Sequence, residues 1–292
     1  MRTPPRVMPA LITPFDERGE VDLGAHTHNM ELLAGRGVTG FLIAGSTGEG
    51  PYLGSGERQA LVEQARRAVN SSAYLVCGVA AESVRQATAQ IEEATSGGAD
   101  AVLVLTPTSL ARGNHDAVGR FFVHVADASP LPVFLYSVPM VTGYELPVAQ
   151  VEALASHPNV IGMKDSGGRP VRIQELARSI TEPFIMFAGA SRALAASLAA
   201  GGYGAITASA NYASDLVERL VEASDVSNAD AEQVQSVLSM LVGVIEPHGI
   251  VGTKAAAAAR GLKAGLPRLP LVALDEETTS QISNLLAETF VA

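Results

Sequence analysis

Residues 159–168 read N-V-I-G-M-K-D-S-G-G, a short apolar run that ends in Lys164 and Asp165 and then gives way to small, turn-forming residues. This pattern is typical of a buried strand that opens into a loop at its carboxyl end. Partial burial favours the uncharged form of a lysine, and an uncharged amine can attack a carbonyl carbon. The alternative is a lysine that pairs with Asp165 or extends its charged end into water.

Apolar, strand-like runs of the same kind recur along the whole chain and are mostly followed by helix-like segments, for example residues 56–69 and 83–96. The runs lie at residues 7–13, 40–44, 74–79, 101–105, 132–136, 159–164, 184–188 and 203–207. Near-continuous apolar strands suit parallel strands that are buried on both faces. We therefore predict an α/β fold, a (β/α)₈ TIM barrel.

A doubly wound open sheet is the alternative fold. That fold normally carries a phosphate-binding loop after its first strand, and T-P-F-D at residues 13–16 is not such a loop. Beyond the eighth run, helical patterns at residues 231–245, 253–260 and 275–289 are more than one closing helix requires. We therefore expect a barrel catalytic domain at residues 1–214 and a small C-terminal helical extension at residues 215–292.

Composition excludes several classes of protein. The net charge of −10 argues against a nucleic-acid-binding face. Cys77 is the only cysteine, so no internal disulfide can form, and we expect a buried strand residue. Glycines interrupt the apolar stretch 193–210, so we expect no membrane span there. The N-terminus lacks a secretory apolar region, and we expect a cytoplasmic protein.

In a barrel of this type the working residues lie at the carboxyl ends of the strands. The expected strand ends carry small residues, hydroxyl groups, one phenol and one amine, with no histidine and no group of carboxylates. We therefore expect neither a metal ion nor a cofactor. His26 and His28 lie two positions apart in an expected helix, and we interpret both as surface residues.

An amine, a phenol and a loop rich in hydroxyl groups suit Schiff-base chemistry on a 2-oxo acid. The amine of Lys164 would attack the C2 carbonyl, and the resulting imine would accept electrons from a breaking bond at C3. Tyr136, at the end of the fifth expected strand, would carry protons. The loop G-S-T-G-E at residues 45–49 would bind the carboxylate through backbone amides and hydroxyls.

Three motifs, G-S-T-G-E at 45–49, Y-S-V-P at 136–139 and G-M-K-D-S-G-G at 162–168, resemble the class I pyruvate-dependent lyases. This family includes dihydrodipicolinate synthase, N-acetylneuraminate lyase and 4-hydroxy-2-oxoglutarate aldolase. The resemblance extends from P-A-L-I-T-P-F at 9–15 to L-P-R-L-P-L at 266–271. It implies a homotetramer that binds pyruvate, and it implies functional roles for particular residues.

By this resemblance Lys164 is the Schiff-base lysine, Tyr136 is the proton-relaying phenol and Thr47 belongs to the same relay. Ser46, with Thr47, would bind the pyruvoyl carboxylate. We also predict substrate contacts from the residue after Lys164-Asp165 and from the ends of the last two strands: Ser166, Gly189 and Ile206.

Within the family, Y-S-V-P-x-x-T-G followed by H-P-N-V-I-G-M-K-D-S-G-G is most similar to 4-hydroxy-2-oxoglutarate aldolase. Dihydrodipicolinate synthases usually carry an arginine two residues after the Y-x-V-P proline, and this chain has Val141 there. Many members also carry tyrosines after the fourth strand, one of which reaches the neighbouring subunit's site. This chain reads T-P-T-S-L at residues 106–110.

We therefore predict retro-aldol cleavage of a 4-hydroxy-2-oxo acid, with pyruvate as one product. A dehydratase or aldolase of a 2-oxo-3-deoxy sugar acid and dihydrodipicolinate synthase are the alternative enzymes. A 2-oxo-acid-binding protein with little turnover is the alternative of another class.

Overall fold

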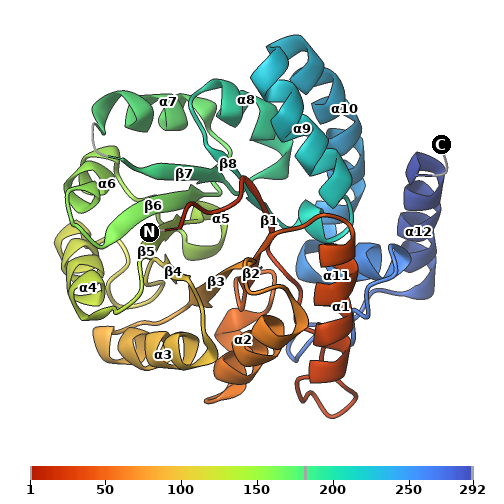
Figure 1. The fold of residues 1–292 in the computed structure, drawn as a ribbon, viewed down its shortest axis with the longest axis horizontal. Helices are drawn as coiled ribbons and strands as arrows, with labels where there is room; N and C mark the ends of the chain where they lie inside the picture. The colour runs from red at the N-terminus through yellow and green to blue at the C-terminus, as the bar shows by residue number, and fades with distance from the viewer. Residues whose placement is uncertain (1, 181–182, 291–292) are drawn as a thin grey trace.

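Eight short parallel strands make one sheet in the order β1-β8-β7-β6-β5-β4-β3-β2 (Figure 1). The computed structural model describes residues 2–180 and 183–290. The sheet closes where the amide of Leu11 donates a 2.9 Å hydrogen bond to the carbonyl of Leu42, beside a parallel bridge between Ala10 and Leu42. The predicted (β/α)₈ TIM barrel is therefore confirmed. The strands are β1 (Val7–Pro9), β2 (Gly40–Ile43), β3 (Tyr74–Val79), β4 (Ala101–Leu105), β5 (Val133–Ser137), β6 (Val160–Asp165), β7 (Ile185–Ala188) and β8 (Gly204–Thr207).

The strand bounds follow the prediction within one residue, with β1 as the exception. β1 ends at Pro9 rather than at residue 13. Just beyond it, the amides of Ala10 and Leu11 still bond to the neighbouring strands, whereas two other backbone groups bond to the side chain of Asn211. The Asn211 side chain accepts from the Ile12 amide at 3.1 Å and donates to the Ala10 carbonyl at 2.8 Å. The chain therefore stays buried there without continuing the strand.

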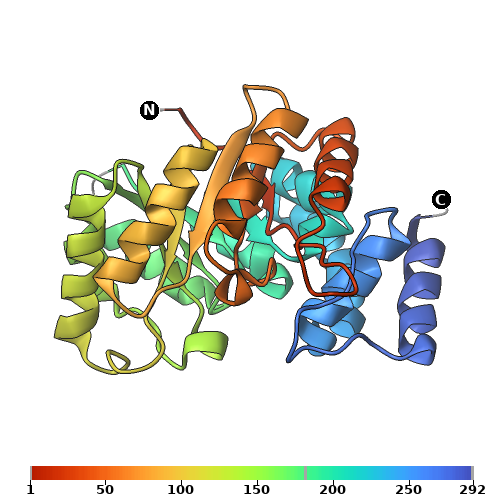
Figure 2. The same cartoon turned by 90° about the horizontal axis from the view of Figure 1, so that it is seen from below.

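Helices surround the barrel, and α5 covers part of the mouth at the carboxyl ends of the strands (Figures 1 and 2). Gly98 caps α3 with φ +88°, as its position after an expected helix predicts. The barrel helices are α1 (Leu23–Gly35), α2 (Glu57–Ala68), α3 (Val84–Gly97), α4 (His115–Ala128), α5 (Pro139–Thr142), α6 (Val148–Ala155), α7 (Pro170–Ser179) and α8 (Leu194–Ala199), with 3₁₀ turns η1 (Gly50–Tyr52), η2 (Ser191–Ala193) and η3 (Ser209–Asn211).

The barrel interior is filled by inward-facing side chains and is not a channel. Phe134 and Phe187 meet edge to face, with ring centres 5.8 Å apart. Tyr136 lies in the same buried cluster. Close packing of this kind leaves reactive groups only at the ends of the strands. The remaining members of the cluster are Met8, Ala10, Leu42, Tyr74, Val76, Ala101, Leu103, Leu105, Val138, Ile161 and Ile206.

Four further helices and a 3₁₀ turn follow the barrel: α9 (Ser214–Val226), α10 (Asn228–Ile245), η4 (Glu246–His248), α11 (Gly249–Ala259) and α12 (Glu276–Phe290). They share a second apolar cluster with α8, to which α12 contributes Ile282 and Leu286. Figure 2 shows α11 and α12 beside the barrel. The expected C-terminal helical extension is present. Its boundary at residue 215 remains a prediction, and residues 1, 181–182 and 291–292 of the two expected domains lie outside the described residues.

Among the described residues, one helical stretch, Asn228–Ala259, is long and apolar enough to span a membrane, and an 18-residue window of it has a mean hydropathy of 1.4. It is not one straight helix, because η4 with Pro247 and the positive φ of Gly249 separate α10 from α11. Leu238, Leu241 and other residues of its inner face belong to the second apolar cluster. Length and composition alone are therefore weak support for a span.

Two sequence interpretations have different outcomes. Cys77 lies fully buried in β3, as predicted, and burial raises the pKa of its thiol to about 12. The interpretation of His26 as a surface residue was wrong, because its side chain is only 1% exposed. It shares the inner face of α1 with Ala25, Met30 and Leu33, the helical spacing that packs on the barrel.

Candidate active site

Tyr136 and Lys164 are register partners on adjacent parallel strands, β5 and β6. Side chains at paired positions project from the same face of a sheet. The amine nitrogen of Lys164 lies 3.4 Å from the hydroxyl oxygen of Tyr136 and 4.5 Å from the centre of its ring. Both side chains are buried. The expected pairing of amine and phenol at the carboxyl ends of these strands is therefore present in the structure.

Lys164 neither pairs with Asp165 nor extends into water. Asp165 follows Lys164 on the strand and therefore projects from the opposite face. Its carboxylate accepts a 2.7 Å hydrogen bond from Nε of Arg172 in α7 and a 2.8 Å bond from the Gly167 amide. Lys164 is only 4% exposed. The alternative interpretation of this lysine is thus wrong, and the sequence reasoning did not identify Arg172.

Opposing effects act on the pKa of the Tyr136 phenol. Burial alone would raise its pKa, but the positive charge of Lys164 and hydrogen bonds with Ser46, Ser166 and Lys164 outweigh burial. The pKa of Tyr136 consequently lies below its ordinary value. These contacts also bring the hydroxyls of Ser46 and Ser166, predicted from two distant motifs, to the same phenol.

The loop after β2 is a tight turn with several internal ties. The Glu49 amide donates to the Ser46 carbonyl at 3.0 Å, and the Thr13 hydroxyl donates to the Gly48 carbonyl at 2.6 Å. Ser46 and Thr47 are half-buried. No hydrogen bond joins the Thr47 side chain to Tyr136 among residues 2–180 and 183–290. The part of Thr47 in the proton relay therefore remains a prediction.

Gly189 lies where any side chain would displace the reactive groups. A Cβ atom there would come within 2.0 Å of the Ser166 hydroxyl oxygen and 2.7 Å of Cε of Lys164. Its amide donates a 2.7 Å hydrogen bond to the carbonyl of Asp165. Ile206 is fully buried in the barrel interior cluster that contains Tyr136. A substrate contact from either residue remains a prediction.

A cleft of about 740 Å³ opens beside these residues. Ser46, Thr106, Thr108 and Val141 are among its lining residues, whereas Lys164 is not. The loop after β4 is folded onto Glu82, which also lines the cleft. The carboxylate of Glu82 accepts from the amides of both Thr108 and Ser109, at 3.0 and 2.9 Å, and from their hydroxyls. Nothing in the sequence indicated that Glu82 would hold this loop.

Known proteins match the chain over nearly its whole length. The model of the dihydrodipicolinate synthetase family matches residues 3–289. A 4-hydroxy-tetrahydrodipicolinate synthase of Streptomyces coelicolor is 33% identical over 279 residues, which cover 94% of this chain and 90% of the relative.

Solved structures agree with this match. A putative dihydrodipicolinate synthetase from Pseudomonas aeruginosa is 29% identical, with a TM-score of 0.90 and coverage of 97% of this chain and 98% of that chain. A prophage protein of the dihydrodipicolinic acid synthase family from E. coli K12, solved in complex with pyruvate, is 28% identical, with a TM-score of 0.89 and coverage of 98% of both chains. The chain therefore belongs to the dihydrodipicolinate synthetase family and is a class I, pyruvate-dependent lyase of the aldolase type.

Proposed function

We propose that this enzyme cleaves a 4-hydroxy-2-oxo acid by a retro-aldol reaction and releases pyruvate. The observation that carries the proposal is the 3.4 Å contact between the buried amine of Lys164 and the phenol of Tyr136. The amine attacks C2 of the substrate, and the carbinolamine loses water to give an imine that links Lys164 to C2. Tyr136 transfers the protons that this dehydration requires.

The carbon–carbon bond then breaks toward the imine. Tyr136 accepts the proton of the C4 hydroxyl, the C3–C4 bond breaks, and its electron pair moves through C3 to the imine nitrogen. The aldehyde leaves, and the enamine takes up a proton at C3. Water then hydrolyses the imine, which releases pyruvate and restores the amine of Lys164. No external oxidant or reductant takes part in this sequence.

The substrate carboxylate is assigned to the hydroxyls of Ser46 and Thr47, and Ser166 is assigned to the reacting end of the substrate. Ser46 and Ser166 contact Tyr136, which supports these assignments. Val141 lines the cleft where dihydrodipicolinate synthases usually carry arginine. A guanidinium group can bind a carboxylate through two hydrogen bonds, and valine cannot. This difference counts against the synthase reaction named among the relatives.

Two other enzymes of the same chemistry are alternatives. The relative from Streptomyces coelicolor is a 4-hydroxy-tetrahydrodipicolinate synthase, which favours that reaction. The uncharged side chain of Val141 would also accept a 2-oxo-3-deoxy sugar acid. Product formation should be compared for 4-hydroxy-2-oxoglutarate, a 2-oxo-3-deoxy aldonate, and pyruvate with the aldehyde partner of the synthase. A larger kcat/KM for either of the last two would replace the aldolase proposal.

Borohydride reduction in the presence of pyruvate tests the imine itself. One reduced pyruvyl group is expected on the peptide that contains Lys164, and none is expected in Lys164→Met. An unlabelled Lys164, under conditions that label a known family member, would overturn the proposal. Thermal stabilisation by pyruvate with negligible turnover of all three substrates would instead identify a 2-oxo-acid-binding protein.

We further propose a homotetramer in the cytoplasm. Leu110 and Met140, near the mouth of the barrel, are 101% and 90% exposed in the single chain. Apolar side chains so exposed are typical of surfaces that another subunit covers. Sedimentation equilibrium of the purified protein tests the assembly, and a monomer at micromolar concentration would contradict it.

A further inference from the structure

A buried ion pair joins the C-terminal extension to the loop after β2. Lys254 projects from α11, and its amine nitrogen lies 2.7 Å from Oε1 of Glu49. Lys254 is 4% exposed and Glu49 is 1% exposed. The same amine donates a 2.6 Å hydrogen bond to the carbonyl of Leu266 and lies 4.9 Å from the centre of the Phe15 ring. Burial lowers the pKa of the Lys254 amine, and the hydrogen bond and negative charge of Glu49 partly oppose this lowering.

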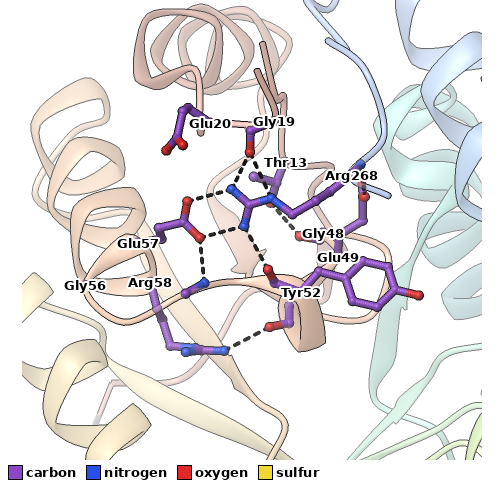
Figure 3. Close-up of polar contacts among 12 residues, drawn as sticks. Thr13, Gly19, Glu20, Gly48, Glu49, Tyr52, Gly56, Glu57, Arg58 and Arg268 are labelled. Atoms are coloured by element: carbon purple, nitrogen blue, oxygen red, sulfur yellow. Dashed lines mark hydrogen bonds and ion pairs between the residues drawn. The ribbon is translucent and has the colours of Figure 1, made fainter. Parts of the chain in front are cut away.

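Glu49 has a second anchor in the segment that follows α11. The backbone amide of Arg268 donates a 2.8 Å hydrogen bond to Oε2 of Glu49. The guanidinium group of Arg268 binds both carboxylate oxygens of Glu57 at 2.6 Å and donates to the carbonyl of Tyr52 at 2.8 Å (Figure 3). The loop and the turn after it are therefore attached on this side to residues of the C-terminal segment.

The C-terminal segment itself is held firmly against the barrel. The Leu266 amide donates a 2.9 Å hydrogen bond to the carbonyl of Phe15, and the Arg268 guanidinium carbon lies 4.2 Å from the centre of the Phe15 ring. Gly265 permits this approach, because it has φ +62° and a Cβ atom there would lie 2.6 Å from the Phe15 carbonyl oxygen. Lys254 and Arg268 therefore bind Glu49 from a segment that is itself held in place against the barrel.

Glu49 needs such anchors because of its backbone. It adopts φ +56°, a left-handed conformation that is unfavourable for a residue with a side chain. Its amide closes the turn onto the Ser46 carbonyl. A change in the backbone of Glu49 would therefore move Ser46 and Thr47, which lie three and two residues before it.

We propose that Lys254, through its ion pair with Glu49, is a positioning residue that holds Ser46 and Thr47 where they bind the carboxylate of the 2-oxo acid. This inference rests on the proposed function of those two hydroxyls. The loop at residues 45–49 is correctly placed only when the C-terminal segment is docked. Lys254 itself does not touch substrate.

The test compares Lys254→Met, Lys254→Arg and the double variant Glu49→Gln/Lys254→Met. Lys254→Met should raise the KM for the 2-oxo acid substrate and the dissociation constant of pyruvate by about tenfold or more. The change in kcat should be smaller. Lys254→Arg should recover most of this affinity, because arginine keeps a positive charge in reach of Glu49. The double variant leaves no unpaired buried carboxylate, so it should fold and still bind pyruvate weakly.

A second measurement does not depend on catalysis. The hydroxyl of Ser46 contributes to the low pKa of Tyr136. Displacement of the loop should therefore raise the pKa of Tyr136, seen in the ultraviolet absorbance of its phenolate. Arg66→Met is the matched control, because it removes the 2.7 Å pair with Asp100, which precedes β4 at the opposite end of the barrel.

Unchanged pyruvate affinity and an unchanged pKa of Tyr136 in a folded double variant would overturn the inference. Equal effects in Arg66→Met and Lys254→Met would also overturn it, since they would indicate a general loss of stability. Failure of borohydride labelling in the unmodified enzyme would instead overturn the proposed function, and the pKa of Tyr136 would still report on the loop.

Discussion

The carboxylate of Asp165 is paired with Arg172 and not with its sequence neighbour Lys164. Nε of Arg172 lies 2.7 Å from Oδ2 of Asp165, and both side chains are buried. Lys164 and Asp165 are consecutive residues of β6, so their side chains project from opposite faces of the strand. Arg172 keeps that carboxylate on the outer face of the strand.

Arg172→Met should destabilise the protein by about 3 to 5 kcal/mol, because removal of one partner leaves a buried unpaired charge. Urea unfolding measures this loss. Arg172→Met/Asp165→Asn should recover part of the stability. The control is Arg169→Met, which removes a pair with Glu145 in which Arg169 is 63% exposed and should cost less than about 1 kcal/mol. Equal losses in both single variants would contradict this account.

Lys164→Met should raise the pKa of Tyr136, because it removes the charge and the hydrogen bond that oppose burial. Four other tyrosines, Tyr74, Tyr144, Tyr203 and Tyr212, have pKa values raised by burial. Tyr136 should therefore ionise before them in an ultraviolet titration. Tyr136→Phe identifies its step in the titration curve. A curve that Lys164→Met leaves unchanged would show that the two groups are not coupled.

Gly189→Ala should reduce kcat/KM by about a hundredfold, because its methyl group would displace both the Ser166 hydroxyl and Cε of Lys164. The double variant Gly189→Ala/Ser166→Ala removes the hydroxyl that the new methyl group would meet most closely. It should therefore recover part of the pyruvate labelling of Lys164. Gly35→Ala is the control, since a Cβ atom there meets nothing within 4 Å. Normal activity in Gly189→Ala would show that the site tolerates the extra group.

His26 should make the fold sensitive to acid. Burial lowers its pKa from 6.5 to about 4, an effect that the nearby Leu61 backbone partly opposes. The unfolded chain therefore binds the proton more tightly than the folded chain. This contribution to stability is complete above pH 6.5 and is lost as the pH falls toward 4, by about 3 kcal/mol at most.

His26→Leu should flatten the dependence of the unfolding free energy on pH between 6.5 and 4. Chemical denaturation at several pH values measures this slope. His28→Gln, two residues along the same helix, should keep the slope of the unmodified protein. If His26→Leu and the unmodified protein lose stability in parallel, His26 does not titrate in this range.

Much of the fold could be predicted because its determinants are local. The apolar runs that became β3 and β4 were predicted to the residue, since parallel strands buried on both faces need uninterrupted apolar sequence. β1 was predicted too long, because an apolar run does not reveal that the Asn211 side chain binds the Ile12 amide and the Ala10 carbonyl. His26 was wrongly predicted to be a surface residue, because the polar residues beside it in the sequence do not indicate which face of α1 packs on the barrel.

The sequence by itself determined the barrel and the pairing of Lys164 with Tyr136. The alternation of apolar runs and helix-like segments predicts a barrel whose consecutive strands are neighbours, and the carboxyl ends of neighbouring parallel strands must meet. Only the tertiary structure decided which residues form the buried ion pairs: Arg172 pairs with Asp165, and Lys254 pairs with Glu49. A buried charge takes whichever partner folding brings within about 4 Å, and distance along the chain does not reveal that partner.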